Sequence, residues 1–229
     1  MNFKEFEELF KSGVKRITLT EDVILETDEK ETYEMGVEIN ENGLIINGNG
    51  HAIDGNAQVS LLCIKAEVTL KNIVFKNAYC EYSGGAIINE GDLMVENCRF
   101  CHNTSDEFGG AIYNNRYSRL GIANSRFRKN RADYGGAIFN DSNSLMNLDR
   151  VVFKSNSSEF EGGAIYNKSE LSLHDALFYS NASFKGGAIY NEGMLNIEDC
   201  NFEKNIASEG NDIENQNENS LNVINCIFY

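Results

Sequence analysis

The side chains best suited to chemistry are few in this sequence and widely separated. Its three histidines are His51, His102 and His174, and two of its six cysteines, Cys98 and Cys101, form a Cys-x-x-Cys segment. Such a pair can be half of a zinc site, but zinc needs a second pair of similar spacing, and the sequence contains none. The histidines occupy unrelated positions of the repeat described below. We therefore expect no metal site and no cofactor.

Acidic residues are plentiful, yet their spacing does not indicate catalysis. Carbohydrate cleavage needs paired carboxylates at a fixed separation, or a calcium cluster with a basic residue as proton acceptor. Adjacent acids occur, as in Glu198-Asp199, but without the regular spacing of calcium-binding repeats. The sequence contains no Pro, so an Arg-x-Pro-x-x-Arg segment is excluded, and it has no Gly-His-Gly or Asp-Asp segment. We expect no catalytic residue.

The net charge and the apolar segments exclude two classes of partner. The formal charge is -15, from 20 basic and 35 acidic residues, and such a surface repels phosphate backbones, so we expect no nucleic-acid partner. No stretch approaches the ~18 consecutive apolar residues of a transmembrane helix, so we expect no membrane insertion by this segment. The first eleven residues mix charged and apolar side chains and do not resemble a secretory signal peptide. This pattern predicts a cytoplasmic protein or one whose signal has been removed.

The elements that would position these side chains follow an internal repeat. Gly-Gly-Ala-Ile starts at Gly84, Gly109, Gly135, Gly162 and Gly186, at intervals of 25, 26, 27 and 24 residues. An asparagine follows two positions after the isoleucine of each copy, and a degenerate copy starts at Gly210. A repeat of this length is typical of solenoids, in which each repeat forms one coil.

A second motif of alternating apolar residues lies between these copies and leads to a phenylalanine. The equivalent phenylalanines are Phe75, Phe100, Phe127, Phe153, Phe178, Phe202 and Phe228. Apolar residues alternate over only three to five positions before a turn residue intervenes, which predicts short strands and tight bends. Cys98, Cys200 and Cys226 share one mostly apolar column, which indicates buried structural side chains.

These patterns predict an all-β chain folded as a parallel β-helix of about eight coils. Three strands per coil would stack on those of the next coil, about 4.8 Å away, and form three parallel sheets around a core. We expect a single domain over 1–229, with irregular first coils over 14–67 and the repeats over 68–229. Apolar residues at helical spacing predict a short helix over 2–12, which would cover the open end of the first coil.

The sequence offers one candidate binding surface. If alternate residues of the third strand point outward, the position before the repeated asparagine forms an exposed apolar stripe. This stripe comprises Ile88, Tyr113, Phe139, Tyr166 and Tyr190. Exposed rings can stack on sugars or anchor a protein partner. The alternative is that the rings stack on one another and shield the sheet.

The Gly-Gly-Ala-Ile copies and the Phe-x-x-Asn segments, such as Phe100 to Asn103, resemble the repeats of chlamydial polymorphic outer-membrane proteins and the adhesin-like surface proteins of methanogenic archaea. The segment GLIINGNGHAIDGN at 43–56 is similar to the opening coil of pectate-lyase-like β-helix proteins. These motifs together cover most of the chain. The resemblance implies a single-stranded, right-handed parallel β-helix, a cell-surface or extracellular location, and a role in adhesion.

Three classes of function remain open. We expect a non-enzymatic, adhesin-like module that presents a flat β-helix face to a glycan or a surface protein. The alternative is a carbohydrate-active enzyme of the β-helix class, either a polysaccharide lyase or a glycoside hydrolase, and a third class is a structural spacer. An exposed aromatic face would favour binding, a carboxylate cluster in a groove would favour the enzyme, and a featureless polar surface would favour the spacer.

Overall fold

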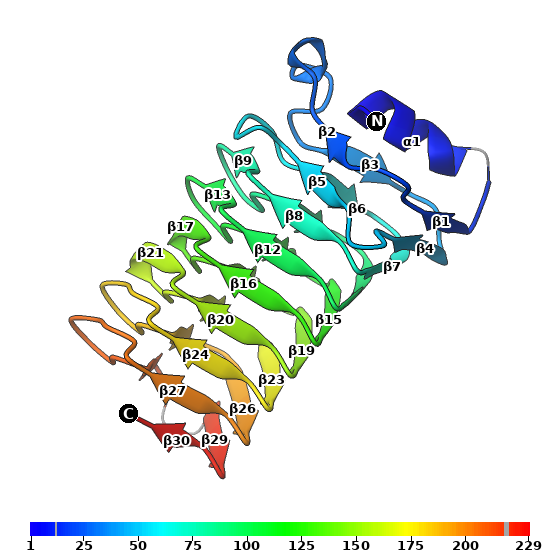
Figure 1. Cartoon of the computed structure of the whole chain (residues 1–229). Helices are drawn as coiled ribbons and strands as arrows, with labels where there is room; N and C mark the ends of the chain where they lie inside the picture. Colours follow the sequence, from blue (N-terminus) through cyan, green and yellow to red (C-terminus); the bar gives the residue numbers. More distant parts are fainter. Residues whose placement is uncertain (12, 218–219) are drawn as a thin grey trace.

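The chain forms a right-handed parallel β-helix in which each coil lies on the one before it (Figure 1). The structure is a computed structural model that describes residues 1–11, 13–217 and 220–229. Over these residues, three long parallel sheets of nine, nine and eight strands run along the axis. The predicted all-β class, the parallel pairing and the solenoid of about eight coils are confirmed.

Successive strands of each sheet come from successive coils. The first sheet contains β1 (Arg16–Thr18), β4 (Leu44–Asn47), β7 (Glu67–Lys71), β11 (Asp92–Glu96), β15 (Arg119–Ala123), β19 (Leu145–Asp149), β23 (Glu170–His174), β26 (Met194–Glu198) and β29 (Leu221–Ile224). The second contains β2 (Val23–Ile24), β5 (Ala52–Asp54), β8 (Val74–Lys76), β12 (Arg99–Cys101), β16 (Arg126–Arg128), β20 (Val152–Lys154), β24 (Leu177–Tyr179), β27 (Asn201–Glu203) and β30 (Ile227–Phe228). The third contains β3 (Val37–Ile39), β6 (Leu62–Ile64), β10 (Ile87–Asn89), β14 (Ile112–Asn114), β18 (Ile138–Asn140), β22 (Ile165–Asn167), β25 (Ile189–Asn191) and β28 (Ile213–Asn215).

A continuous stack of phenylalanine rings fills one side of the interior. The predicted column from Phe75 to Phe228 is confirmed, with neighbouring ring centroids 4.6–5.0 Å apart and interplanar angles of 15° or less. The rings follow the coil spacing because parallel, in-register strands place each residue beside its counterpart, as Phe100 is paired with Phe75 and Phe127.

Two columns of buried asparagines run parallel to the rings. In the first, Asn103, Asn130, Asn156 and Asn181 each donate from Nδ2 to Oδ1 of the next asparagine at 2.9–3.0 Å, and the column ends at Asn205. In the second, Asn89 to Asn215 on the third sheet are linked in the same way at 2.6–2.8 Å. Both columns also bond backbone groups at the bends, so the polar atoms buried there have partners.

The bends explain why the chain is rich in asparagine and glycine. One residue per coil between the first and second sheets is left-handed, with φ of 50–55° at Asn72, Asn97, Asn124, Arg150, Asp175, Asp199 and Asn225. Asn and Asp tolerate this conformation better than other non-glycine residues, and the predicted tight bends are present. At the Gly-Gly pair, Gly135 has a φ of +64°, and a Cβ on Gly136 would lie 2.3 Å from the carbonyl oxygen of Gly163. Only glycine fits both positions.

The prediction of three sheets is incomplete, because a fourth, shorter sheet precedes the Gly-Gly pairs. It contains β9 (Tyr79–Cys80), β13 (Thr104–Ser105), β17 (Arg131–Tyr134) and β21 (Ser157–Glu161). The polar residues in these segments suggest a loop rather than a strand. Coil-to-coil backbone pairing nevertheless extends through them, as between Thr104 and Arg131, since each segment already lies beside its copy in the next coil.

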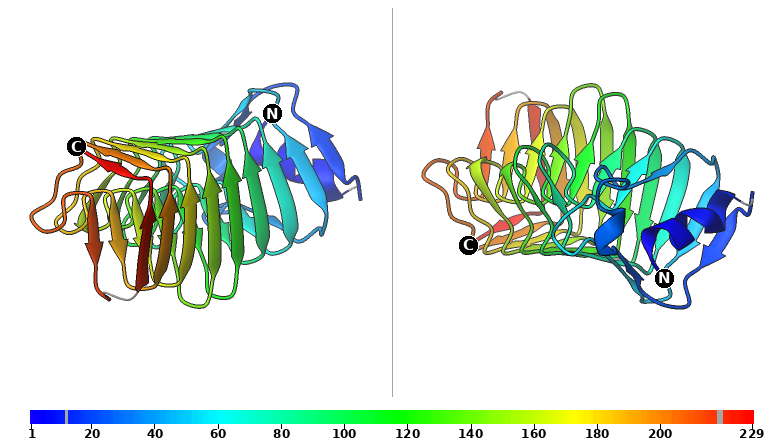
Figure 2. Two further views of the ribbon diagram at one scale, coloured as in Figure 1. Left: turned by 90° about the horizontal axis from the view of Figure 1, so that it is seen from below. Right: turned by 90° about the horizontal axis from the view of Figure 1, so that it is seen from above.

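The N-terminal helix α1 (Phe3–Lys11) lies at the start of the solenoid, far from the C-terminus (Figure 2). Its buried Phe3, Phe6 and Phe10 pack on the core of the first coils. The Glu29 carboxylate, in the short helix η1 (Thr27–Glu29), accepts hydrogen bonds from the backbone N–H groups of Phe3 and Lys4, at 3.2 and 2.8 Å. The predicted helix is confirmed over 3–11, and the predicted end at Ser12 lies outside the described residues.

Candidate functional site

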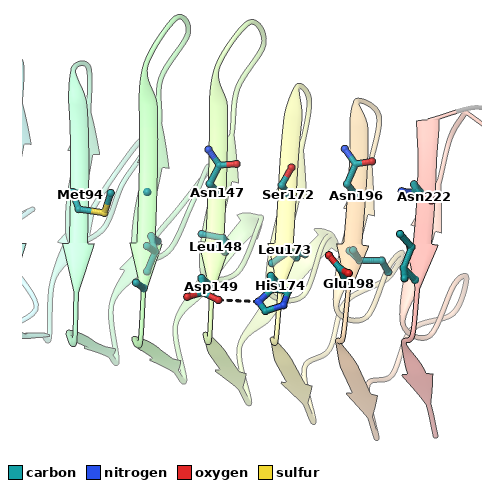
Figure 3. Close-up of a pocket in the computed structure, with 15 residues that line it drawn as sticks. Met94, Asn147, Leu148, Asp149, Ser172, Leu173, His174, Asn196, Glu198 and Asn222 are labelled. Atoms are coloured by element: carbon teal, nitrogen blue, oxygen red, sulfur yellow. Dashed lines mark hydrogen bonds and ion pairs between the residues drawn. The ribbon is translucent and has the colours of Figure 1, made fainter.

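A shallow groove of about 510 Å³ crosses the outer face of the first sheet from β11 to β29 (Figure 3). In-register pairing arranges its outward side chains in two rows, because each one lies beside its counterpart on the next strand. We call the first the amide row, which consists of Asn147, Ser172, Asn196 and Asn222. We call the second the charged row, which consists of Asp149, His174 and Glu198.

Toward β11, small residues replace the polar side chains that line the groove. Gly121 and Ala123 on β15 occupy the positions that Asn147 and Asp149 hold on β19. A Cβ at Gly121 would meet Met94 Cε at 2.7 Å, so the Met94 side chain lies over Gly121 and closes that end. Ile224 lines the opposite end. The groove therefore has a polar middle and an apolar residue at each end.

The amide row keeps its hydrogen-bonding groups available. All four of its side chains are exposed. Within the part of the chain that the structure describes, none of them takes part in a side-chain hydrogen bond. Each asparagine amide offers two donors and an acceptor, and the serine offers both functions. The row thus presents donors and acceptors at intervals of about 4.8 Å, the strand spacing.

In the charged row, His174 lies between carboxylates from the two flanking coils. Its Nδ1 is 3.0 Å from Asp149 Oδ1, and its Nε2 is 3.5 Å from Asp199 Oδ2. The hydrogen bond with Asp149, together with the charges of Asp149, Asp199 and Glu198, raises the pKa of His174 above its ordinary value. A protonated imidazole can donate to both neighbouring carboxylates, so this arrangement favours the charged form.

The predicted aromatic stripe is aligned as expected but is not exposed. Register pairing runs from Ile88 through Tyr113, Phe139 and Tyr166 to Tyr190. The expectation of exposure is wrong, because Ile88, Phe139, Tyr166 and Tyr190 are only 3–6% exposed and Tyr113 is half-buried.

The physical reason is that the segments before the Gly-Gly pairs fold over the third sheet. The Phe108 ring lies 4.7 Å from that of Phe139, and the Tyr134 ring lies 5.9 Å from that of Tyr166. Beneath this cover, Tyr113 donates to Asp141 and Tyr166 to Glu192, at 2.8 and 2.7 Å. The stripe is thus the inner layer of an aromatic cluster.

The outer layer of that cluster was missed in the sequence. It carries one aromatic residue per coil, and we call it the aromatic ridge: Tyr82, Phe108, Tyr134, Phe160 and Phe184. Tyr82, Phe160 and Phe184 are 41–54% exposed, and the other two are half-buried. The signal that could have revealed it is an aromatic residue one or two positions before each Gly-Gly pair.

The structure leaves the remaining candidates apart. The six cysteines are free thiols, and burial raises the pKa of Cys98 to about 12, which disfavours the reactive thiolate. His51 Nδ1 lies 3.3 Å from Asp22 Oδ1, while His102 occupies a bend at φ 57°. Among the described residues, no group of three or more His, Cys, Asp or Glu side chains is placed to hold a metal ion.

Stacked coils with phenylalanine and asparagine columns define a parallel β-helix repeat protein. Residues 97–115 and 150–168 match the family model of the Chlamydia polymorphic membrane protein repeat. The chain is therefore similar to these repeats, and the resemblance to the chlamydial proteins inferred from the Gly-Gly-Ala-Ile and Phe-x-x-Asn motifs is confirmed. No curated protein and no solved structure gives a significant match. In the residues described, no helix has the length and apolar character needed to cross a membrane.

Proposed function

We propose that this chain is a non-enzymatic binding module of a cell-surface protein, and that the groove of the first sheet binds a glycan. The surface role rests on the similarity to the Chlamydia polymorphic membrane protein repeat. The observation that carries the glycan assignment is the amide row, four exposed polar side chains in register along a groove of about 510 Å³.

The amide row suits sugar hydroxyls, because both sides of the contact can donate and accept. A single hydrogen bond of this kind contributes only about 0.5–1.5 kcal/mol net, so useful affinity requires several acting together. The repeated coil supplies them without any rearrangement, since the strands fix the spacing. Preorganisation of this kind reduces the entropic cost of binding.

The charged row restricts the class of glycan. Asp149, Glu198 and Asp199 outnumber the cations beside them, which are His174 and the Arg150 guanidinium paired with Asp149, and the whole chain carries a charge of -15. Carboxylated or sulfated sugars would be repelled by this field. We therefore assign neutral or amine-bearing oligosaccharides to the groove.

The arrangement of His174 supports binding rather than catalysis. A general base needs a ring nitrogen free to accept a proton from the substrate. Both nitrogens of His174 face carboxylates, at 3.0 and 3.5 Å, and the raised pKa favours the proton-carrying form. When it is protonated, the imidazole can donate to Asp149, and its other nitrogen lies within ion-pair distance of Asp199.

A glycan array tests the proposal with the double variant Asn147→Ala/Asn196→Ala. We expect the wild-type protein to bind neutral or amine-bearing glycans and the variant to lose at least about tenfold in affinity, since two hydrogen-bonding side chains are removed. Thermal unfolding should be unchanged, because neither side chain has an internal partner among the described residues.

The matched control is Asn201→Ala, which removes an exposed asparagine from the outer face of the second sheet. It should bind like the wild type. Equal binding by the groove variant and the control would refute the groove assignment. Release of reducing ends from a bound glycan would instead favour the carbohydrate-active enzyme.

A further inference from the structure

The aromatic ridge is a second surface, separate from the groove. Its central rings are in contact, with centroids 5.5 Å apart for Phe108 and Tyr134 and 5.3 Å apart for Tyr134 and Phe160. The fourth sheet and the adjoining segments hold them in place through coil-to-coil pairing, as between Phe108 and Tyr134. Scattered exposed rings need no explanation, but a row that spans successive coils is an unusual feature of a soluble surface.

Carboxylates line the ridge on the same segments. They are Glu81, Asp106, Glu107, Asp133 and Glu159. Within the described residues, none of these five forms an ion pair. Burial and the charges of Glu159, Asp106 and Glu107 raise the pKa of Asp133, although Arg131 acts in the opposite direction. Asp133 is therefore close enough to Glu159, Asp106 and Glu107 to be repelled by them.

The inner layer of the cluster already shows which group its rings accept. Lys168 Nζ lies over the rings of Phe139 and Tyr166, 5.5 and 5.4 Å from their centroids. A cation is attracted to the negative face of an aromatic ring, and arginine also stacks flat on the ring while its N–H groups bond a carboxylate. Asp106 accepts a hydrogen bond from the Tyr79 hydroxyl, but no cation pairs with any of the five carboxylates in the residues described. Rings beside such carboxylates match both halves of that interaction.

We propose that the aromatic ridge is a docking surface for a protein segment rich in arginine. The guanidinium groups lie on the rings of Tyr82, Phe160 and Phe184 and pair with the flanking carboxylates. Charge complementarity selects this partner over a glycan, because a neutral sugar brings no positive charge to the five carboxylates and an anionic sugar is repelled. The ridge and the groove lie on different sheets, so the two sites can be tested separately.

The probe is a short soluble peptide of alternating arginine and glycine, with affinity measured by fluorescence anisotropy. One variant, Asp133→Asn/Glu159→Gln, removes two ridge charges, and another, Phe160→Leu/Phe184→Leu, removes two rings while keeping apolar side chains. We expect each to weaken binding by about tenfold, and a lysine–glycine peptide to bind the wild type at least about fivefold more weakly than the arginine peptide.

The matched control is Glu67→Gln/Glu170→Gln, which removes two exposed carboxylates from the first sheet, outside the segments that carry the ridge. It should weaken binding by less than about threefold, and the groove variant Asn147→Ala/Asn196→Ala should bind the peptide like the wild type. If the control weakened peptide binding as much as the ridge charge variant, the peptide would be attracted only by the overall negative charge of the chain, and the proposal would be overturned. Unchanged binding by the ring variant, or loss of glycan binding caused by ridge variants alone, would also overturn it.

Discussion

Asparagine has opposite roles on the inner and outer sides of the coil wall. Asn156, inside, is 1% exposed, donates to Asn181 and to the Phe127 carbonyl, and accepts from the backbone and side chain of Asn130. Asn147 and Asn196, on the outer face, are exposed and have no internal side-chain partner among the described residues. Residue type therefore does not decide the role, whereas the direction of the side chain does.

The two sides also differ in how regular they are. The inner columns repeat the same residue in coil after coil, because each side chain must fit its own copy about 4.8 Å away. The outer position of the amide row changes along the sheet, from Thr69 through Met94 and Gly121 to Asn147. An outer face free of this packing constraint can carry a local site, and the amide row begins where this outer position becomes polar, at Asn147.

The largest expected effect separates an inner phenylalanine from an outer one. Phe153→Ala should lower the free energy of unfolding by about 3–5 kcal/mol, since it leaves a cavity in a ring stack with neighbours at 5.0 and 4.8 Å. Phe160→Ala should cost about 1 kcal/mol or less, because that ring is 41% exposed. Urea unfolding followed by circular dichroism measures both free energies. Similar losses of stability in the two variants would show that the inner and outer rings do not differ in structural role.

The next effect separates the two kinds of asparagine directly. Asn156→Ala should lower the free energy of unfolding by at least about 2 kcal/mol, because it orphans the buried Asn130 N–H and the Phe127 carbonyl at about 1–3 kcal/mol per group. Asn196→Ala should change it by less than about 0.5 kcal/mol. The same unfolding experiment applies, and a large loss in the second variant would show that the amide row is structural.

The sequence predicted the inner side of the wall far better than the outer side. The phenylalanine and asparagine columns were predictable because stacking like on like imposes the repeat on the chain itself. The burial of Tyr166 and Tyr190 was not predictable. It depends on the segment of Tyr134 folding over the third sheet as part of a fourth sheet, and the polar residues of that sheet suggest loops. The repeat aligns Asp149 with His174 on an outward face, but the groove was not predictable, because its bounds depend on how side chains such as Met94 lie on the sheet.

The smallest expected effect concerns His174, the titratable group of the outer face. Its folded-state pKa is raised, mainly by the hydrogen bond with Asp149. The protonated form therefore stabilises the fold fully below the unfolded pKa of about 6.5, and this contribution is lost as the pH rises through the folded pKa. Proton NMR of the imidazole Cε1–H should give a midpoint above that of an unfolded peptide containing the same residue.

Asp149→Asn should bring this midpoint down toward the peptide value, because the substitution removes both the charge and the strongest acceptor at Nδ1 while Asp199 remains 3.5 Å from Nε2. The effect on stability should be slight, since the ring is half exposed and solvent screens the pair. A wild-type midpoint at or below the peptide value would mean that the charged row does not hold a proton between its carboxylates. His174 would then be free to act as a base, and the argument for a binding groove over a catalytic one would lose its main support.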